Sequence, residues 1–74
     1  MAKLPVLKPI DVIKRFKKLG YIEDRQRGSH VILYHPRTKY LASIPLHVRD
    51  LAKGTLRAIL KQSNITREEF MKAK

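Results

Sequence analysis

The chain has 74 residues, of which 17 are Lys or Arg and six are Asp or Glu, so its formal charge at neutral pH is +11. This length suits one compact domain, and the lack of cysteine excludes a disulfide, a thiolate metal site and a thiol nucleophile. The positive charge predicts a polyanionic partner, with nucleic acid as the first choice, an acidic protein as the second and a membrane surface as the third.

The chain carries no signal for a membrane or for secretion. No apolar run reaches the roughly 18 residues of a transmembrane helix, and the apolar part of residues 1–9 is too short for a signal peptide. The lack of cysteine fits a reducing compartment. We therefore expect a cytoplasmic, soluble protein that makes no use of a membrane, with residues 1–8 as a short extended lead-in and residues 9–74 as a single domain.

A first helix is predicted over residues 9–19. Pro9 fits the first helical turn, where its missing N–H costs nothing, and Asp11 suits the positive end of the helix dipole. Gly20 is a natural stop directly after the helix. Apolar residues recur at helical spacing, and Lys and Arg occupy most of the remaining circumference. The apolar stripe consists of Ile10, Val12, Ile13, Phe16 and Leu19.

Three short β-type runs follow, at residues 21–27, 29–35 and 40–44. They are joined at Gly28 and by a turn over residues 36–39, and such short connections predict an antiparallel sheet. Alternation places His30, Ile32 and Tyr34 on one face of the second strand. Val31, Leu33 and His35 then lie on the other face, and the pattern alone does not tell which face is the core side.

The C-terminal third predicts a loop over residues 45–53 and a helix from Gly54 or Thr55 to residue 63. Asp50 and Thr55 are alternative caps for this helix, and Asn64 suits a left-handed terminator. The buried side of the helix is expected to consist of Leu56, Ile59 and Leu60.

A capping-box pattern, Thr66-x-x-Glu69, predicts one last short helix that Phe70 anchors to the core. The predicted fold is therefore α+β, in the order α-β-β-β-α with a three-stranded antiparallel sheet and a short C-terminal helix.

The acidic residues do not suggest a metal site. Metal-dependent nucleases need several carboxylates that converge on one or two cations. Glu23 and Asp24 are neighbours on a predicted strand, so they point to opposite faces, and Glu68 and Glu69 suit a helix start. The three glycines are isolated and form no nucleotide-binding loop. The sequence therefore predicts neither a metal nor another cofactor.

His30 is the strongest candidate for chemistry. It follows Gly28, which can take the positive φ of a tight hairpin turn. RNA contains its own nucleophile, the 2′-hydroxyl, so a base, a proton donor and positive charge suffice for its cleavage. His30 can supply the base, Arg25 and Arg27 the charge, and Ser29 a hydrogen bond to phosphate or to the imidazole.

The other two histidines are weaker candidates. His35 precedes Pro36 and is expected to be a turn residue on the face opposite to His30. His47, in a loop, lines the same pocket as His30 or has a structural role only, and the sequence favours the structural role.

The aromatic and basic residues of the sheet suggest contacts with RNA. Tyr21, Tyr34 and Tyr40 fall at strand ends among cations, which suits base stacking, although ordinary packing is favoured for at least two of them. The basic helix start at residues 53–57 suits phosphate binding. The expected RNA-binding residues are Arg25, Arg27, Gly28, Ser29, Lys39, Lys53 and Arg57.

Five stretches occur together in an order and spacing that resemble the HicA-type toxins of prokaryotic toxin–antitoxin pairs. They are LGY at residues 19–21, RQRGSH at 25–30, IPLH at 44–47, GTLRAIL at 54–60 and NITREEF at 64–70. The resemblance covers residues 9–71, which is nearly the whole predicted domain. Two residues depart from the family pattern, namely Lys8 before the first helix and Asn64 after the second, and both affect helix ends only.

The resemblance implies a double-stranded-RNA-binding-domain-like fold and a ribosome-independent, metal-independent mRNA interferase. The catalytic histidine of the family's Gly-Ser-His signature matches His30, and the other two signature positions match Gly28 and Ser29. A HicB-type antitoxin that covers this site is the implied protein partner, and single-stranded mRNA is the implied substrate.

Three functions remain open at the level of the sequence. The leading hypothesis is an endoribonuclease toxin with His30 as the acid/base group. The second is a non-catalytic RNA-binding module, which predicts salt-sensitive binding that leaves the RNA intact. The third is a small basic scaffold for an acidic protein.

Overall fold

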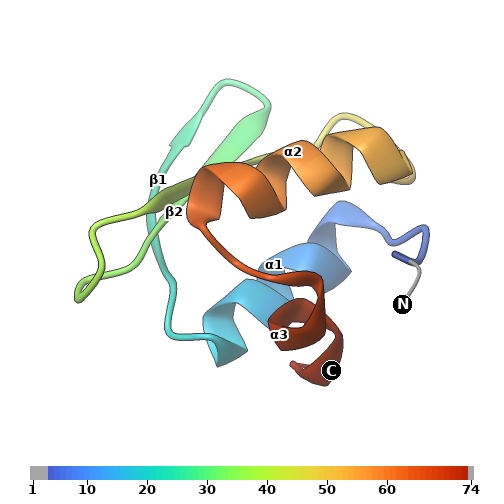
Figure 1. Cartoon of the computed structure of the whole chain (residues 1–74). Helices are drawn as coiled ribbons and strands as arrows, with labels where there is room; N and C mark the ends of the chain where they lie inside the picture. The colour runs from blue at the N-terminus through green and yellow to red at the C-terminus, as the bar shows by residue number, and fades with distance from the viewer. Residues whose placement is uncertain (1–3, 74) are drawn as a thin grey trace.

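The chain folds as a helix, a three-stranded antiparallel sheet and two further helices (Figure 1). This arrangement confirms the predicted α+β fold and its α-β-β-β-α order. The elements are α1 (Pro9–Lys18), β1 (Ile22–Arg27), β2 (His30–Tyr34), β3 (Leu41–Pro45), α2 (Lys53–Ser63) and α3 (Arg67–Lys72). The computed structural model describes residues 4–73, so the predictions made for residues 1–3 and for residue 74 lie outside the described part.

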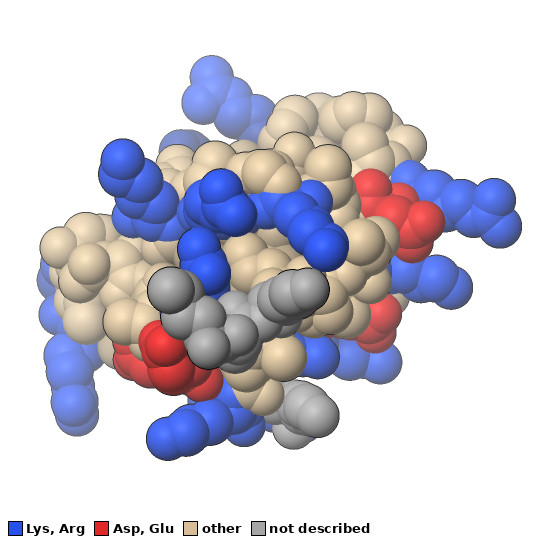
Figure 2. All heavy atoms as spheres, turned by 45° about the vertical axis from the view of Figure 1, so that its right-hand side comes forward, with Lys and Arg blue, Asp and Glu red and all other residues tan. Residues whose placement is uncertain are grey.

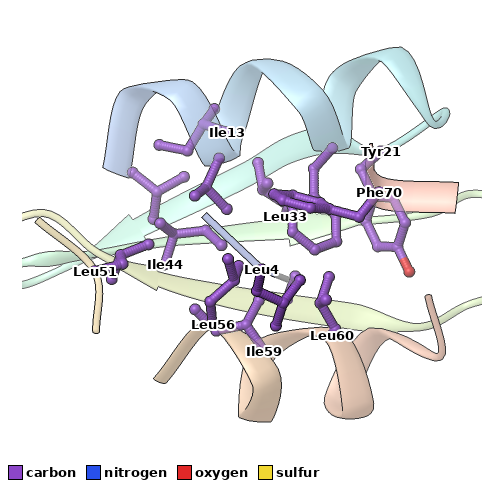
Figure 3. Close-up of a cluster of buried hydrophobic side chains, with 14 residues drawn as sticks. Leu4, Ile13, Tyr21, Leu33, Ile44, Leu51, Leu56, Ile59, Leu60 and Phe70 are labelled. Carbon is purple, nitrogen blue, oxygen red and sulfur yellow. The ribbon is translucent and has the colours of Figure 1, made fainter. Parts of the chain in front are cut away.

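Helices α1 and α2 lie on the same side of the sheet, and the core fills the space between them (Figures 1 and 3). Val31 and Leu33 of β2 are buried under the helices, together with Ala42 and Ile44 of β3. The predicted helix residues Leu56, Ile59 and Leu60 are buried as well. The other face of β2, which carries His30, faces away from the helices and is only half-buried. The structure thus identifies the core side that the sequence pattern left open.

The sheet runs in the order β1-β2-β3, with β1 at one edge. Arg27 pairs with His30 at the β1–β2 hairpin, and the register shifts between Glu23 and Arg25, where β1 contains a bulge. All six residues of β1 are exposed. Polar, bulged edge strands of this kind resist pairing with other chains.

The lead-in before α1 packs against the body of the protein. Leu4 is only 5% exposed and belongs to the core, where it lies between α1 and α2 (Figure 3). The Leu51 amide donates a hydrogen bond to the Leu7 carbonyl at 2.8 Å, which ties the lead-in to the loop before α2. The described part of the predicted lead-in therefore contributes to the core.

Helix α1 is amphipathic as predicted, with one exception. Val12, Ile13 and Phe16 are buried, whereas Ile10 is 54% exposed. The assignment of Ile10 to the apolar stripe was wrong because six residues separate it from Phe16, which places it about 120° away around the helix. Gly20 follows the helix with φ +100°, as expected of a terminating glycine.

Two of the three predicted ends of α2 and α3 agree with the structure. Asn64 ends α2 in the left-handed conformation, and the Thr66 capping box begins α3. The expected side-chain cap of α2 is absent, however, because Ala52 occupies the N-cap position. Thr55 lies inside the first turn, and Asp50 lies two residues before the cap.

None of the helices found along residues 4–73 combines the length and the apolar character needed to cross a membrane.

Candidate active site

The β1–β2 hairpin holds the side chain of His30 at the end of the sheet. Gly28 and Ser29 form a two-residue loop, and Gly28 has φ +59° at its first position, which a type II′ turn reserves for glycine. A Cβ atom on Gly28 would meet no atom within 4 Å, so the backbone conformation, and not space, requires the glycine. Arg27 pairs directly with His30, so both side chains lie on the same face of the sheet.

The loop after β3 brings a second imidazole to this point. The Leu46 amide donates a hydrogen bond to the Ser29 carbonyl at 2.6 Å, which fastens the loop to the hairpin turn. The rings of His30 and His47 then lie with their centroids 5.9 Å apart and their planes at 60°. The structure thus favours the alternative that the sequence ranked second, in which His47 lines the His30 pocket. The sequence indicates that His47 lies in a loop. It contains no signal for the hydrogen bond from Leu46 to Ser29 that brings this loop to the hairpin.

His30 and His47 line one pocket of about 330 Å³ at the end of the sheet. The start of α2 forms another wall of the pocket. The N-cap residue Ala52 offers no side-chain acceptor, so no side chain caps the amides of the first turn of α2. These amides carry the positive end of the helix dipole. The lining consists of His30, Pro45, His47, Val48, Asp50, Leu51, Ala52 and Thr55. Two imidazoles, a helix start and one carboxylate thus share the pocket, and Asp50 and Thr55 were not predicted as members.

The predicted RNA-binding residues fall into two groups. Arg27, Gly28 and Ser29 adjoin His30 at the hairpin. Lys53 is the first residue of α2, next to Ala52 in the pocket wall. This group agrees with a single site around His30.

The remaining predicted RNA-binding residues lie farther from the pocket. Arg25 pairs with Ile32, two residues along β2 from His30. Arg57 is exposed one turn into α2 and does not line the pocket. Lys39 lies beyond the opposite end of β2, where its Nζ donates a hydrogen bond to the Tyr34 Oη at 3.0 Å. The structure therefore does not bring Lys39 to the His30 pocket.

The third histidine has a different role. The Nδ1 atom of His35 accepts hydrogen bonds from the amides of Arg37 and Thr38, each at 3.2 Å, so His35 organises the β2–β3 turn as predicted. Its ring packs edge-on against Tyr21 with the centroids 5.1 Å apart. Burial raises the pKa of Tyr21, whose Oη donates a hydrogen bond to the Ser63 carbonyl at 2.7 Å. These residues form a structural cluster on the helix side of the sheet.

Cations outnumber acidic residues on the surface of the protein. Figure 2 shows Lys and Arg side chains spread over the visible face, with acidic groups at a few positions near its margins. Within residues 4–73, the structure contains no group of three or more His, Cys, Asp or Glu side chains placed to hold a metal ion.

Comparison with known proteins identifies the family. Residues 11–65 match the family described as the HicA toxin of bacterial toxin–antitoxin systems, a segment that extends from α1 past the end of α2 and includes His30 and His47. A search of the curated proteins finds no match to the chain. Because the family match covers most of the 74 residues, the chain belongs to the HicA toxins of bacterial toxin–antitoxin systems.

Proposed function

We propose that the protein is a metal-independent endoribonuclease, an mRNA interferase, and that His30 is its acid/base catalyst. One observation carries the proposal: the His30 imidazole lies 5.9 Å from that of His47, centroid to centroid, in a pocket that the start of α2 also lines. Arg27 pairs with His30 across the hairpin and adds a positive charge on the same face. A phosphodiester reaction at such a site has two proton carriers and fixed positive charge available.

The reaction uses the 2′-hydroxyl of the RNA as its nucleophile. His30 takes the proton from this hydroxyl, the 2′-oxygen forms a bond to phosphorus, and the bond from phosphorus to the 5′-oxygen breaks. A proton is delivered to the departing 5′-oxygen, so the products are a 2′,3′-cyclic phosphate and a 5′-hydroxyl. Arg27 and the first-turn amides of α2 stabilise the negative charge that builds up on the phosphoryl oxygens.

We assign the delivery of the second proton to His47. A base and an acid that act on opposite sides of one phosphorus need to be close without touching, and the 5.9 Å between the two ring centroids meets this condition. His47 is exposed, so it can exchange protons with water between turnovers. His35 is unsuited to the role because its Nδ1 is occupied by the turn amides of Arg37 and Thr38.

A HicB-type antitoxin is the proposed protein partner, and it neutralises the toxin by covering the His30 pocket. The net charge of +11 favours an antitoxin with an acidic binding surface, because complementary charge speeds association. The same charge attracts the mRNA substrate.

The test is cleavage of a long single-stranded RNA in EDTA by the native protein and by His30→Ala and His47→Ala. We expect each substitution to slow cleavage by roughly 10²- to 10⁴-fold, the usual contribution of a general acid or base. A nucleotide ester with p-nitrophenolate as the leaving group needs no proton donor. It should therefore be cleaved nearly normally by His47→Ala and poorly by His30→Ala.

The control is His35→Asn, which changes the histidine outside the pocket and keeps an acceptor near the position of Nδ1. Unchanged cleavage by His30→Ala would show that His30 is not the catalyst. Intact RNA with a mobility shift, in the absence of any antitoxin, would instead favour a non-catalytic RNA-binding module.

A further inference from the structure

One face of the sheet has no helix against it. Both α1 and α2 lie on the opposite side (Figure 1), and directly paired residues of neighbouring strands point to the same side. We call this side the open face. By strand register, it carries His30, Ile32 and Tyr34 of β2 together with their direct partners on β1 and β3.

The open face carries exposed apolar side chains at the end of the sheet that is far from His30. Ile22 and Leu41 flank Tyr34 as its direct partners on β1 and β3, and they are 52% and 44% exposed. Ile32 and Tyr34 themselves are half-buried. Exposed apolar patches with a polar rim mark binding surfaces, and we call Ile22, Ile32, Tyr34 and Leu41 the apolar strip.

Cations border this apolar strip. Lys39 Nζ lies 5.7 Å from the centroid of the Tyr34 ring and donates a hydrogen bond to its Oη. Arg25 pairs with Ile32 at the other margin, and its exposed side chain forms a 3.7 Å ion pair with the neighbouring Asp24. An apolar strip bordered by cations complements a ligand that has flat apolar groups on an anionic backbone.

The open face is also continuous with the His30 pocket. His30 and Tyr34 lie on the same side of one strand, four residues apart, which corresponds to about 13 Å. A single strand of RNA with a phosphate at His30 can therefore extend along β2 to Tyr34. An acidic protein would also match the charge, but continuity with the pocket and an aromatic ring beside a cation favour RNA with unpaired bases.

We propose that single-stranded RNA lies along the open face, with an unpaired base stacked on Tyr34 and its phosphates held by Arg25 and Lys39. This inference rests on the proposed function because it takes RNA as the ligand of the His30 pocket. It gives Lys39, which is remote from the pocket, a role in binding, and it restricts the substrate to RNA whose bases are free to stack.

The test uses His30→Ala protein, so that the RNA stays intact, and a 12-nucleotide single-stranded RNA of mixed sequence at fixed salt. Adding Tyr34→Ala should weaken binding roughly 5- to 150-fold, since a stacked base contributes about 1–3 kcal/mol. Tyr34→Phe should keep most of the affinity because it keeps the ring. Binding to a blunt RNA duplex should be the same with or without Tyr34, because paired bases are not free to stack.

The matched control is Tyr40→Ala. Tyr40 is 43% exposed but lines a different pocket with Tyr21 and His35 on the helix side, so its loss should leave RNA affinity unchanged. A second readout leaves Tyr34 in place: RNA carrying 5-iodouracil, irradiated on the His30→Ala protein, should crosslink to Tyr34. This crosslink supports the proposal even if Tyr34→Ala does not fold.

Three results would overturn the proposal. The first is equal RNA affinity with and without Tyr34→Ala, and the second is crosslinks confined to the helices. The third is that Tyr34→Ala loses binding to a purified HicB-type antitoxin but keeps its binding to RNA. The last result would assign the open face to the protein partner. Failure of this inference is distinct from failure of the proposed function. Cleavage that does not depend on Tyr34 refutes only the inference, whereas Tyr34-dependent binding without cleavage by the native protein refutes only the nuclease.

Discussion

Strand alternation separates the histidines of this protein into two environments. His30 points to the open face of β2, where the loop after β3 adds His47 to its pocket. His35 lies just beyond the same strand on the helix side, where it accepts hydrogen bonds from the β2–β3 turn and packs against Tyr21. An odd number of residues between two positions on one strand keeps them on the same face and an even number separates them, so His30 and His35 cannot serve one site.

The buried phenol of Tyr21 makes stability depend on pH at the alkaline end. Burial raises its pKa, partly offset by the hydrogen bond to Ser63, and nearby Glu69 and Tyr40 raise it further. Above about pH 10, the unfolded chain loses this proton before the folded protein does, so the unfolded state binds fewer protons and the free energy of unfolding falls as pH rises. The contribution of Tyr21 to the free energy of unfolding is fully present below the ordinary tyrosine pKa. It is lost as the pH rises through the raised pKa of the folded protein.

Denaturant unfolding between about pH 8 and pH 11 measures this effect. The decline of the unfolding free energy with pH should be shallower in Tyr21→Phe than in the native protein. The exposed Tyr40 serves as the control, and Tyr40→Phe should keep most of the native slope. Equal slopes for the native protein and Tyr21→Phe would contradict this role of Tyr21.

Two glycines should respond in opposite ways to alanine. Gly20 has φ +100°, and a Cβ atom there would lie 2.7 Å from the Nε2 atom of His35. We expect Gly20→Ala to destabilise the fold by roughly 1–3 kcal/mol, from backbone strain and from displacement of His35. Gly54 lies in α2, and a Cβ atom there would meet no atom within 4 Å, so Gly54→Ala should stabilise the fold by up to about 1 kcal/mol. Thermal or urea unfolding of both variants tests the pair, and a stable Gly20→Ala protein would refute the first part.

The elements themselves were predictable because each has local signals. Pro9 and Gly20 delimit α1, Gly28 marks the first hairpin, and the Thr66 capping box starts α3. The start of α2 was not predictable in the same way. Its N-cap is Ala52, which makes no side-chain hydrogen bond, so the capping rules contain no signal for it.

The short helix α3 should depend on its cap. Thr66 Oγ1 accepts a hydrogen bond from the Glu69 amide at 3.1 Å, and Glu69 Oε1 accepts one from the Thr66 amide at 3.0 Å. Thr66→Ala should lower the free energy of unfolding by about 0.5–2 kcal/mol, because α3 anchors Phe70 in the core. Glu68→Ala is the control: it removes an exposed carboxylate from the same turn without touching the cap. Equal effects of the two substitutions would show that charge, and not the capping box, stabilises α3.

At the scale of the whole molecule, the sequence predicted the fold better than the composition of the pocket. The turn before His30 could be predicted because a local motif, Gly28-Ser29-His30, specifies it. The proximity of His47 and of the α2 start depends on contacts between segments distant in sequence, such as the hydrogen bond from Leu46 to Ser29. The apolar pattern of β2 likewise could not tell the core face from the open face, since both faces carry apolar residues.

The sheet divides the molecule into a helix side and an open face. The helix side contains the core and the cluster around Tyr21, and the open face carries the exposed apolar strip that leads to the His30 pocket. The net charge of +11 suits a polyanionic ligand. In this arrangement, stability and the proposed chemistry depend on largely separate sets of residues, so substitutions on the open face can test function without dismantling the core.

In the proposed reaction, His30 promotes RNA cleavage through the RNA's own 2′-hydroxyl without a metal ion. The most direct measurement compares a ribose RNA with the same sequence fully 2′-O-methylated, both incubated with the native protein in EDTA. We predict that the ribose RNA is cut to fragments ending in 2′,3′-cyclic phosphate, that the methylated RNA stays intact, and that His30→Ala cuts neither. Cleavage of the methylated RNA, or undiminished cleavage by His30→Ala, would contradict the claim.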